Sequence, residues 1–219
     1  MVNILCIETA TTNCSVAIFQ DGKLLDTRED NNNGYSHAEK LHVFIDELLS
    51  ENKISPKNLN AVAVSSGPGS YTGLRIGVST AKGICYSLGI PLISIPTLVS
   101  LAEKIRDPQG FIIPMLDARR MEVYAAGFDA HKKEIFRTRS EILTGSSYQE
   151  FLETGKVYFI GSGTSKFDEI CDHPNAIFIH NESPSSKEMG TNAFLKFENA
   201  DFEDVAYFEP FYLKDFLLG

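Results

Sequence analysis

Two segments of this chain repeat one strand pattern at a constant spacing. Ile7-Glu8 aligns with Leu116-Asp117, and the apolar stretch at 16–19 aligns with the stretch at 125–128. Both alignments have the same offset along the chain, and in each copy an acidic residue ends the first apolar strand. Since a repeated unit folds in the same way twice, we expect two α/β lobes, each a mixed sheet with helices in the order β-β-β-α-β-α-β-α.

The local patterns place the elements of each lobe. In the first copy, apolar runs predict strands at 4–7, 15–19, 23–28, 59–64 and 90–95, and helical spacing predicts helices at 36–50, 74–88 and 97–106. In the second copy the same patterns predict strands at 111–116, 121–128, 134–141, 157–160 and 176–180, and helices at 148–152, 166–171 and 187–198. Asp107-Pro108-Gln109-Gly110 is the strongest linker signal. We therefore place one lobe at residues 1–106 and the other at residues 111–219.

Helix ends are predicted from capping residues. Ser36 with Glu39 three residues later forms the pattern of a capping box. Thr72 is the expected N-cap of the helix at 74–88, and Gly89 is expected to end that helix.

A glycine-rich stretch at 65–77 joins a buried strand to a helix. Gly67, Pro68 and Gly69 force a tight turn, and the helix start after it could hold an anion. The known phosphate patterns do not fit, because no lysine follows Gly73 and the G-x-G-x-x-G spacing is off by one residue. We favour a structural turn and a helix that packs closely on the chain's own sheet or on a partner's helix.

Composition narrows the classes of function. The net charge of −9 argues against nucleic-acid binding by this chain alone, which requires a basic surface. No apolar run approaches a membrane span, and the N-terminus lacks the charged region of a signal peptide. The four scattered cysteines contain no C-x-x-C pair and are expected to be reduced, in a cytoplasmic protein.

Four blocks of sequence resemble the bacterial TsaB (YeaZ) family. They are ILCIETAT at 4–11, GPGSYTGLRIG at 67–77, DARRMEVY at 117–124 and PFYLK at 210–214. The resemblance implies the duplicated acetate kinase/heat-shock chaperone/actin-like (ribonuclease H-like) fold and a role in making N6-threonylcarbamoyladenosine in tRNA. It implies a non-catalytic subunit that pairs with the homologous transferase TsaD. The resemblance also implies that the ATPase TsaE joins the pair and that TsaC supplies the threonylcarbamoyl-adenylate donor.

Few residues have the spacing expected of a metal-binding or nucleotide-binding site. His37 and His42 are five residues apart, which puts them about 140° apart around a helix, so they predict no metal site. The superfamily resemblance places a phosphate-positioning acid at Glu8. Three threonine hydroxyls could assist it, but Ala10 replaces the usual glycine. The candidate nucleotide-binding residues are Thr9, Thr11, Thr12, Gly161 and Gly163.

The remaining groups of polar residues predict structural roles and no catalytic site. Asp117 with Arg119 and Arg120 is expected to form a salt-bridged turn, and no Ser/His/Asp or Cys/His set can be assembled. We expect no firmly bound cofactor, and ATP or ADP only at an interface with a partner. The alternative is a stand-alone ATP-dependent or metal-dependent enzyme of the same superfamily, of the kind once labelled glycoprotease.

A helical docking face is therefore the main functional prediction. The helices at 36–50 and 73–88 are expected to bind TsaD, or a second copy of the chain in its absence, and tRNA is expected to be reached only through the complex. The predicted interface residues are His37, Leu41, Arg75, Gly77, Val78, Ala81 and Lys82. The aromatic tail at 209–216 is expected to dock on the fold.

Overall fold

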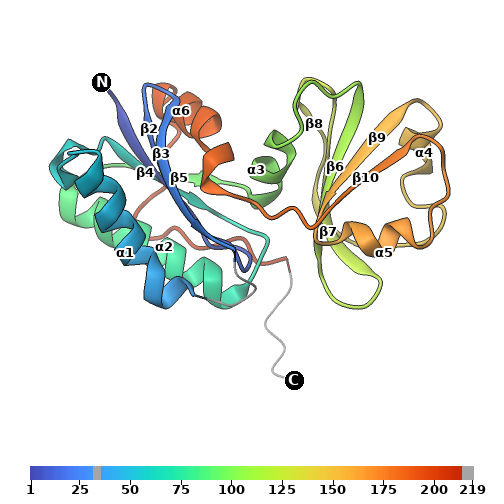
Figure 1. Cartoon of the computed structure of the whole chain (residues 1–219), viewed down its shortest axis with the longest axis horizontal. Coiled ribbons are helices and arrows are strands. Elements are labelled where there is room, and N and C mark those ends of the chain that lie inside the picture. The colour runs from blue at the N-terminus through green and yellow to red at the C-terminus, as the bar shows by residue number, and fades with distance from the viewer. Residues whose placement is uncertain (32–35, 214–219) are drawn as a thin grey trace. The chain divides into compact units, whose positions relative to one another are not determined.

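The computed structural model describes residues 1–31 and 36–213, and its first sheet has the strand order β3-β2-β1-β4-β5 (Figure 1). β1 pairs antiparallel with β2 and parallel with β4, so the sheet is mixed. The strands are β1 (Asn3–Glu8), β2 (Cys14–Gln20), β3 (Lys23–Asp30), β4 (Ala61–Ser65) and β5 (Leu92–Ile95).

The second sheet repeats this order as β8-β7-β6-β9-β10. Its strands are β6 (Gly110–Asp117), β7 (Glu122–Phe128), β8 (Glu134–Ile142), β9 (Lys156–Gly161) and β10 (Ala176–His180). The equivalent order confirms the duplication that the constant offset predicts. The segment that joins the first strand to its parallel neighbour is shorter in the second copy. Phe111 and its partner Val157 lie closer together in the sequence than Ile4 and its partner Ala61.

Helices cover both faces of the first sheet. The two longest are α1 (His37–Glu51) and α2 (Tyr71–Leu88), which lie side by side on one face (Figure 1). Their apolar stripes pack with alternate residues of β1 and β2, such as Leu5 and Ile7, whereas Ile4 and Cys6 face the other side. Each fully buried leucine or isoleucine stabilises this core by about 1.5–3 kcal/mol. The shorter helices are η1 (Pro56–Asn58), α3 (Thr97–Glu103), α4 (Gln149–Leu152), α5 (Thr164–Asp168), η2 (Ser186–Glu188) and α6 (Gly190–Glu198).

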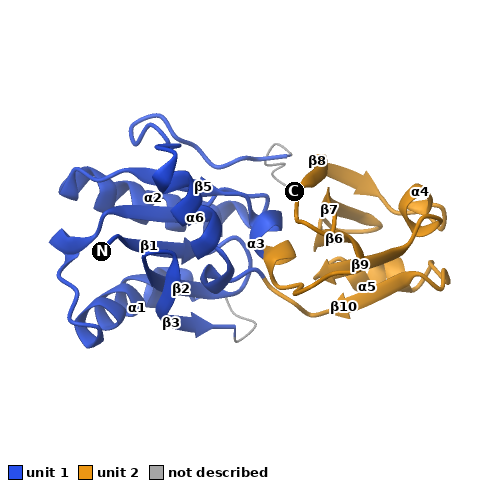
Figure 2. Cartoon of the chain, turned by 90° about the horizontal axis from the view of Figure 1, so that it is seen from above, with its two compact units in different colours: residues 1–100, 184–219 blue, residues 101–183 orange. Residues whose placement is uncertain are grey.

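The chain divides into two compact units, residues 1–100 with 184–219 and residues 101–183 (Figure 2). This division differs from the predicted lobes at 1–106 and 111–219, because α6 packs on the first sheet. Met189, which directly precedes α6, and Ala193 of α6 are fully buried against Ile4 and Cys6. A Cβ atom at Gly190 would lie 1.9 Å from the ring of Phe19, so this close approach requires glycine.

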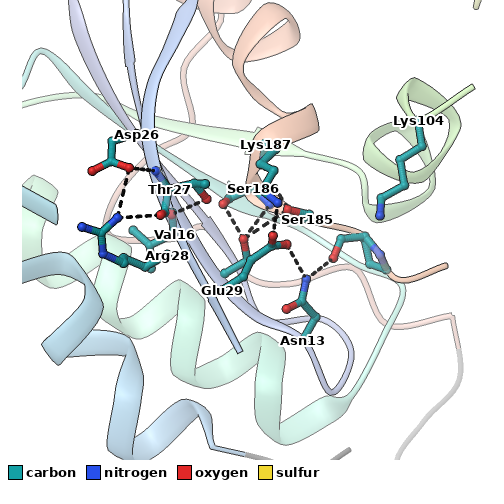
Figure 3. Close-up of polar contacts among 12 residues, drawn as sticks. Asn13, Val16, Asp26, Thr27, Arg28, Glu29, Lys104, Ser185, Ser186 and Lys187 are labelled. Atoms are coloured by element: carbon teal, nitrogen blue, oxygen red, sulfur yellow. Dashed lines mark hydrogen bonds and ion pairs between the residues drawn. The ribbon is translucent and has the colours of Figure 1, made fainter. Parts of the chain in front are cut away.

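A partly buried polar cluster holds the returning segment to β2 and β3 (Figure 3). The Asn13 amide nitrogen donates to Glu29 Oε1 and to the Pro184 carbonyl, both at 3.0 Å. The Ser15 and Ser186 hydroxyls lie 2.6 Å apart, and Lys187 pairs with Glu29. These polar contacts add to the apolar packing of Met189 and Ala193 in holding the returning segment on the first sheet.

Two of the predicted helix caps are wrong. Ser36 makes no side-chain cap; its hydroxyl instead donates to Asp30 Oδ2 at 2.7 Å. Ser70, not Thr72, caps α2, since its hydroxyl accepts from the Gly73 amide at 3.2 Å. Gly89 ends α2 in the left-handed region as predicted. Within the described ranges, no helix combines the length and apolarity needed to cross a membrane.

Candidate functional site

The turn after β1 is filled by helix α2 of the same unit. The Thr9 hydroxyl is buried and donates to the Gly73 carbonyl at 2.8 Å. A Cβ atom at Gly77 would lie 2.2 Å from Thr9 Oγ1, and one at Gly69 would lie 2.3 Å from the Ala10 carbonyl oxygen. These glycines therefore allow α2 and the loop before it to approach the turn after β1. The sequence left open whether this glycine-rich stretch packs on its own chain or on a partner's helix, and at these two glycines it packs on its own chain.

The rest of this turn is bound to helix α1. His37 is buried, and its Nε2 donates to the Thr11 carbonyl at 2.8 Å. Burial lowers the pKa of His37, which favours the neutral ring. The Thr11 hydroxyl accepts from the Asn13 amide at 3.4 Å, and Thr12 is half-buried. His42 is exposed on a different face of α1, and the described part of the chain holds no group of three or more metal-ligating side chains.

Glu8 is a fully buried carboxyl at the end of β1. Burial raises its pKa to about 7. The Ala10 amide, which donates to Glu8 Oε1 at 2.6 Å, and the Ser65 hydroxyl oppose this effect. The carboxyl therefore changes charge near neutral pH, enclosed by its own unit.

The glycine-rich turn at 161–164 is also closed. The Gly163 amide donates to the Met115 carbonyl at 3.0 Å, and the Thr164 hydroxyl donates to the Gly161 carbonyl at 2.8 Å. A Cβ atom at Gly163 would lie 2.8 Å from Val123 Cγ1. Of the five predicted nucleotide residues, all but Thr12 are thus engaged in close contacts within their own unit.

Most of the predicted interface residues face inward. Five are buried in their own unit: His37, Leu41, Gly77, Val78 and Ala81. The α-helical period places their side chains on the sheet side of α1 and α2, so they cannot present side chains to a partner in this structure. Arg75 and Lys82 remain on the surface of α2.

The C-terminal segment binds both of these surface residues. Lys82 Nζ donates to the Ala206 and Phe208 carbonyls at 3.1 and 2.9 Å. Arg75 Nε donates to the Tyr212 hydroxyl at 3.3 Å. The prediction that the tail docks is confirmed at Phe211, whose amide donates to the Ser66 carbonyl at 2.7 Å, and at Tyr212; residues 214–216 of that prediction lie outside the described residues.

A surface groove of about 370 Å³ lies between α1 and α2. Three small residues of α2 line it at a spacing of four, Ser79, Gly83 and Ser87. A Cβ atom at Gly83 would meet nothing within 4 Å. Exposed apolar side chains are available on both helices: Val43 is 49% exposed and Tyr86 is 86% exposed. Ser79, Gly83 and Ser87 form a ridge of small residues on α2. The sequence shows that this helix is rich in small residues, but only the structure shows which of them lie at the surface.

Comparisons with known proteins agree on one family. The family model described as "TsaD: tRNA N6-adenosine threonylcarbamoyltransferase" matches residues 34–215. The tRNA threonylcarbamoyladenosine biosynthesis protein TsaB of Escherichia coli (strain K12) is 27% identical over 98% of this chain and 95% of that protein. The TsaB protein of Buchnera aphidicola subsp. Acyrthosiphon pisum (strain APS) is 31% identical over 90% of each chain.

A solved structure supports the fold. The structure titled "YeaZ from Pseudomonas aeruginosa" matches with a TM-score of 0.84 and 22% identity, over 97% of this chain and 100% of that one. Together with the two sheets of equivalent strand order, this match confirms the predicted duplicated α/β fold with a mixed sheet in each copy.

Proposed function

Because the chain belongs to the TsaD family, and within it to the TsaB (YeaZ) proteins, we propose that it is a non-catalytic subunit that binds and supports a TsaD-like transferase. Its TsaB relatives support a role in tRNA threonylcarbamoyladenosine biosynthesis. Under this proposal the chain contributes a binding surface to tRNA modification, and the transferase carries out the chemistry.

The packing of α2 on the turn after β1 carries the non-catalytic part of the proposal. A phosphate-binding turn needs free backbone amides and room for the ligand. Here Thr9 is bonded to Gly73, the Ser70 amide donates to Ala10 at 2.6 Å, and the glycines face the turn itself. This arrangement supports a loss of phosphate chemistry while the fold is retained.

The groove between α1 and α2 supports the docking part. The matched family model spans residues 34–215 and so includes both helices, and we therefore expect a TsaD-like partner to carry an equivalent pair. Small residues such as Ser79 and Gly83 let a second helix approach to about 8 Å between axes. We place the partner's helix pair in this groove, and a second copy of the chain there when the transferase is absent.

Further partners follow from the same assignment. A TsaE-like ATPase would join the assembled pair, and tRNA would be reached through the complex in the cytoplasm. ATP or ADP would bind at an interface of the complex, not in this chain alone, whose candidate turns are closed by their own contacts.

Reconstitution tests the proposal. The purified chain and the TsaD homologue of the same organism are combined, sized, and supplied with donor, ATP, TsaE homologue and tRNA. Threonylcarbamoyladenosine is then measured by mass spectrometry of tRNA nucleosides. We expect a complex of the two chains and modification that depends on this chain. Equal modification without the chain, or no complex, would contradict the proposal.

The alternative function, a stand-alone ATP-dependent or metal-dependent enzyme, is tested on the chain alone. Calorimetry with ATP and Mg²⁺, followed by a phosphate-release assay, should give neither binding nor turnover. Robust turnover by the isolated chain would favour the enzyme and reject the partner subunit.

A further inference from the structure

The turn between β6 and β7 presents two adjacent arginines in an unusual backbone conformation. Arg119 has φ 72° and Arg120 has φ 49°. Residues with a Cβ rarely adopt this left-handed region, where glycine or asparagine is the usual choice. Among the described residues, these are the only two consecutive non-glycine positions with positive φ. Folding alone would favour other residues here, so the arginine side chains call for a different explanation.

The base of this turn is held rigidly. Asp117 Oδ1 accepts from the Arg119 amide at 2.6 Å and pairs with Lys166 Nζ at 3.0 Å. The same Lys166 ammonium donates to the Glu122 carbonyl at 2.9 Å, and the Asp117 amide donates to the Ser162 hydroxyl at 3.1 Å. The sequence-based expectation that Asp117 pairs with the arginine side chains is therefore wrong: its carboxylate is held by Lys166.

Both guanidinium groups are left available at the surface. Arg119 and Arg120 are exposed, and neither takes part in an ion pair found among residues 1–31 and 36–213. This is notable in a chain with a net charge of −9, where carboxylates are plentiful. Of the two carboxylates that flank the turn, Asp117 pairs with Lys166 and Glu122 accepts from the Ser140 hydroxyl. The turn thus carries two uncompensated positive charges on a fixed support.

We propose that Arg119 and Arg120 contact backbone phosphates of the tRNA substrate, an inference that rests on the proposed function. A guanidinium group offers a planar fork of donors that matches a phosphate, and it keeps its charge at every physiological pH. A polynucleotide strand presents phosphates at short, regular intervals, which suits two adjacent arginines. A protein carboxylate is the competing ligand. This chain has many carboxylates of its own, yet neither arginine pairs with one among the described residues.

The net charge of −9 sets the role of this contact. The chain as a whole repels RNA, so two arginines cannot capture tRNA against that field. Once the transferase holds the tRNA, the same arginines add local phosphate contacts. We therefore assign the turn to positioning of RNA within the assembled complex.

The test replaces the two residues with types that the backbone prefers. Arg119→Asn with Arg120→Gly removes both charges and relieves the left-handed strain, so the variant should fold at least as well. Lys133→Ala with Arg137→Ala removes two exposed charges elsewhere in the same unit and controls for net charge. Arg119→Lys with Arg120→Lys keeps the charges.

The readout is the affinity of the assembled complex for tRNA as a function of salt. Loss of two phosphate contacts should lower the slope of log affinity against log salt by about 2. The affinity deficit should therefore shrink by about tenfold between roughly 50 and 200 mM salt. The control pair should keep the wild-type slope, and the lysine pair should keep most of it.

Three results would overturn the inference or separate it from the proposed function. An unchanged salt slope in the Asn/Gly variant would overturn it. So would weaker assembly with the transferase at an unchanged slope, since that result points to a protein carboxylate. If the wild-type chain does not assemble, the proposed function fails. Failure to assemble therefore rejects both the proposed function and the arginine contact, whereas an unchanged slope in an assembled complex rejects the arginine contact alone.

Discussion

Replacing Gly83 by leucine should stabilise the chain and at the same time block its docking. Gly83 lies inside α2, is exposed, and has open space where a Cβ would be. Glycine in a helix interior costs about 1 kcal/mol relative to alanine, and leucine is nearly as good a helix former. We expect the free energy of unfolding to rise by about 0.7 kcal/mol.

The same leucine side chain would project into the groove of about 370 Å³ between α1 and α2. If a partner helix packs against this ridge, the added atoms force it away or into strained rotamers, at a cost of about 1–3 kcal/mol. Since about 1.4 kcal/mol is a factor of ten, the dissociation constant for the transferase should rise about 5- to 150-fold. Gly77 and Ala81 are unsuitable for this test because both are buried against the chain's own fold.

Urea unfolding of the free chain and calorimetric titration with the transferase measure the two effects separately. Ser50→Leu is the matched control, because Ser50 is exposed on α1 and does not line the groove. A Gly83→Leu chain that binds the transferase with wild-type affinity would show that the groove is not the docking site. A fall in its stability would contradict the open space that the structure gives this position.

Three further predictions concern stability. Gly77→Ala should lower the free energy of unfolding by about 2 kcal/mol, because the new Cβ meets a threonine hydroxyl at 2.2 Å; Gly83→Ala is the control, and equal urea midpoints for the two variants would reject the packing described for α2. Burial raises the pKa of Glu8 from 4.5 to about 7, so the folded chain retains a proton that the unfolded chain loses, and this group lowers stability as pH rises through that range. Glu8→Gln should therefore gain about 3 kcal/mol over wild type between pH 4.5 and 7, and parallel stability–pH curves would refute this. Arg119→Asn with Arg120→Gly should raise the melting temperature, by relief of about 1–2 kcal/mol of left-handed strain, and a lowered melting temperature would contradict the strain.

Much of the fold could be predicted because its signals are local. Alternation and apolar runs identified the ten strands of the described ranges, and the constant offset between the two copies identified the duplication that the two sheets confirm. Gly89 was recognisable as a helix end because only the backbone conformation at that position matters. The turn at 67–69 was predicted for the same reason, since Gly67, with φ 106°, requires a residue without a side chain.

The candidate site was harder to predict because it depends on which surfaces meet. The sequence showed that α2 carries small residues, but Gly77 and Gly83 look equivalent in it. In the structure one touches Thr9 and the other faces open space. The capping predictions failed in a similar way: the Ser36 hydroxyl found a stronger acceptor in Asp30, on a neighbouring strand.

The amino-acid sequence by itself determined the elements, their repetition and the family, because periodicity and short motifs are written in neighbouring residues. Only the tertiary structure decided that α6 packs on the first sheet and that α2 closes the turn after β1. It also decided that Asp117 forms its ion pair with Lys166 and not with the two arginines. Each of these outcomes is a competition between partners distant in sequence. Shape and burial in the folded chain determine which of these contacts form, and no local sequence pattern predicts them.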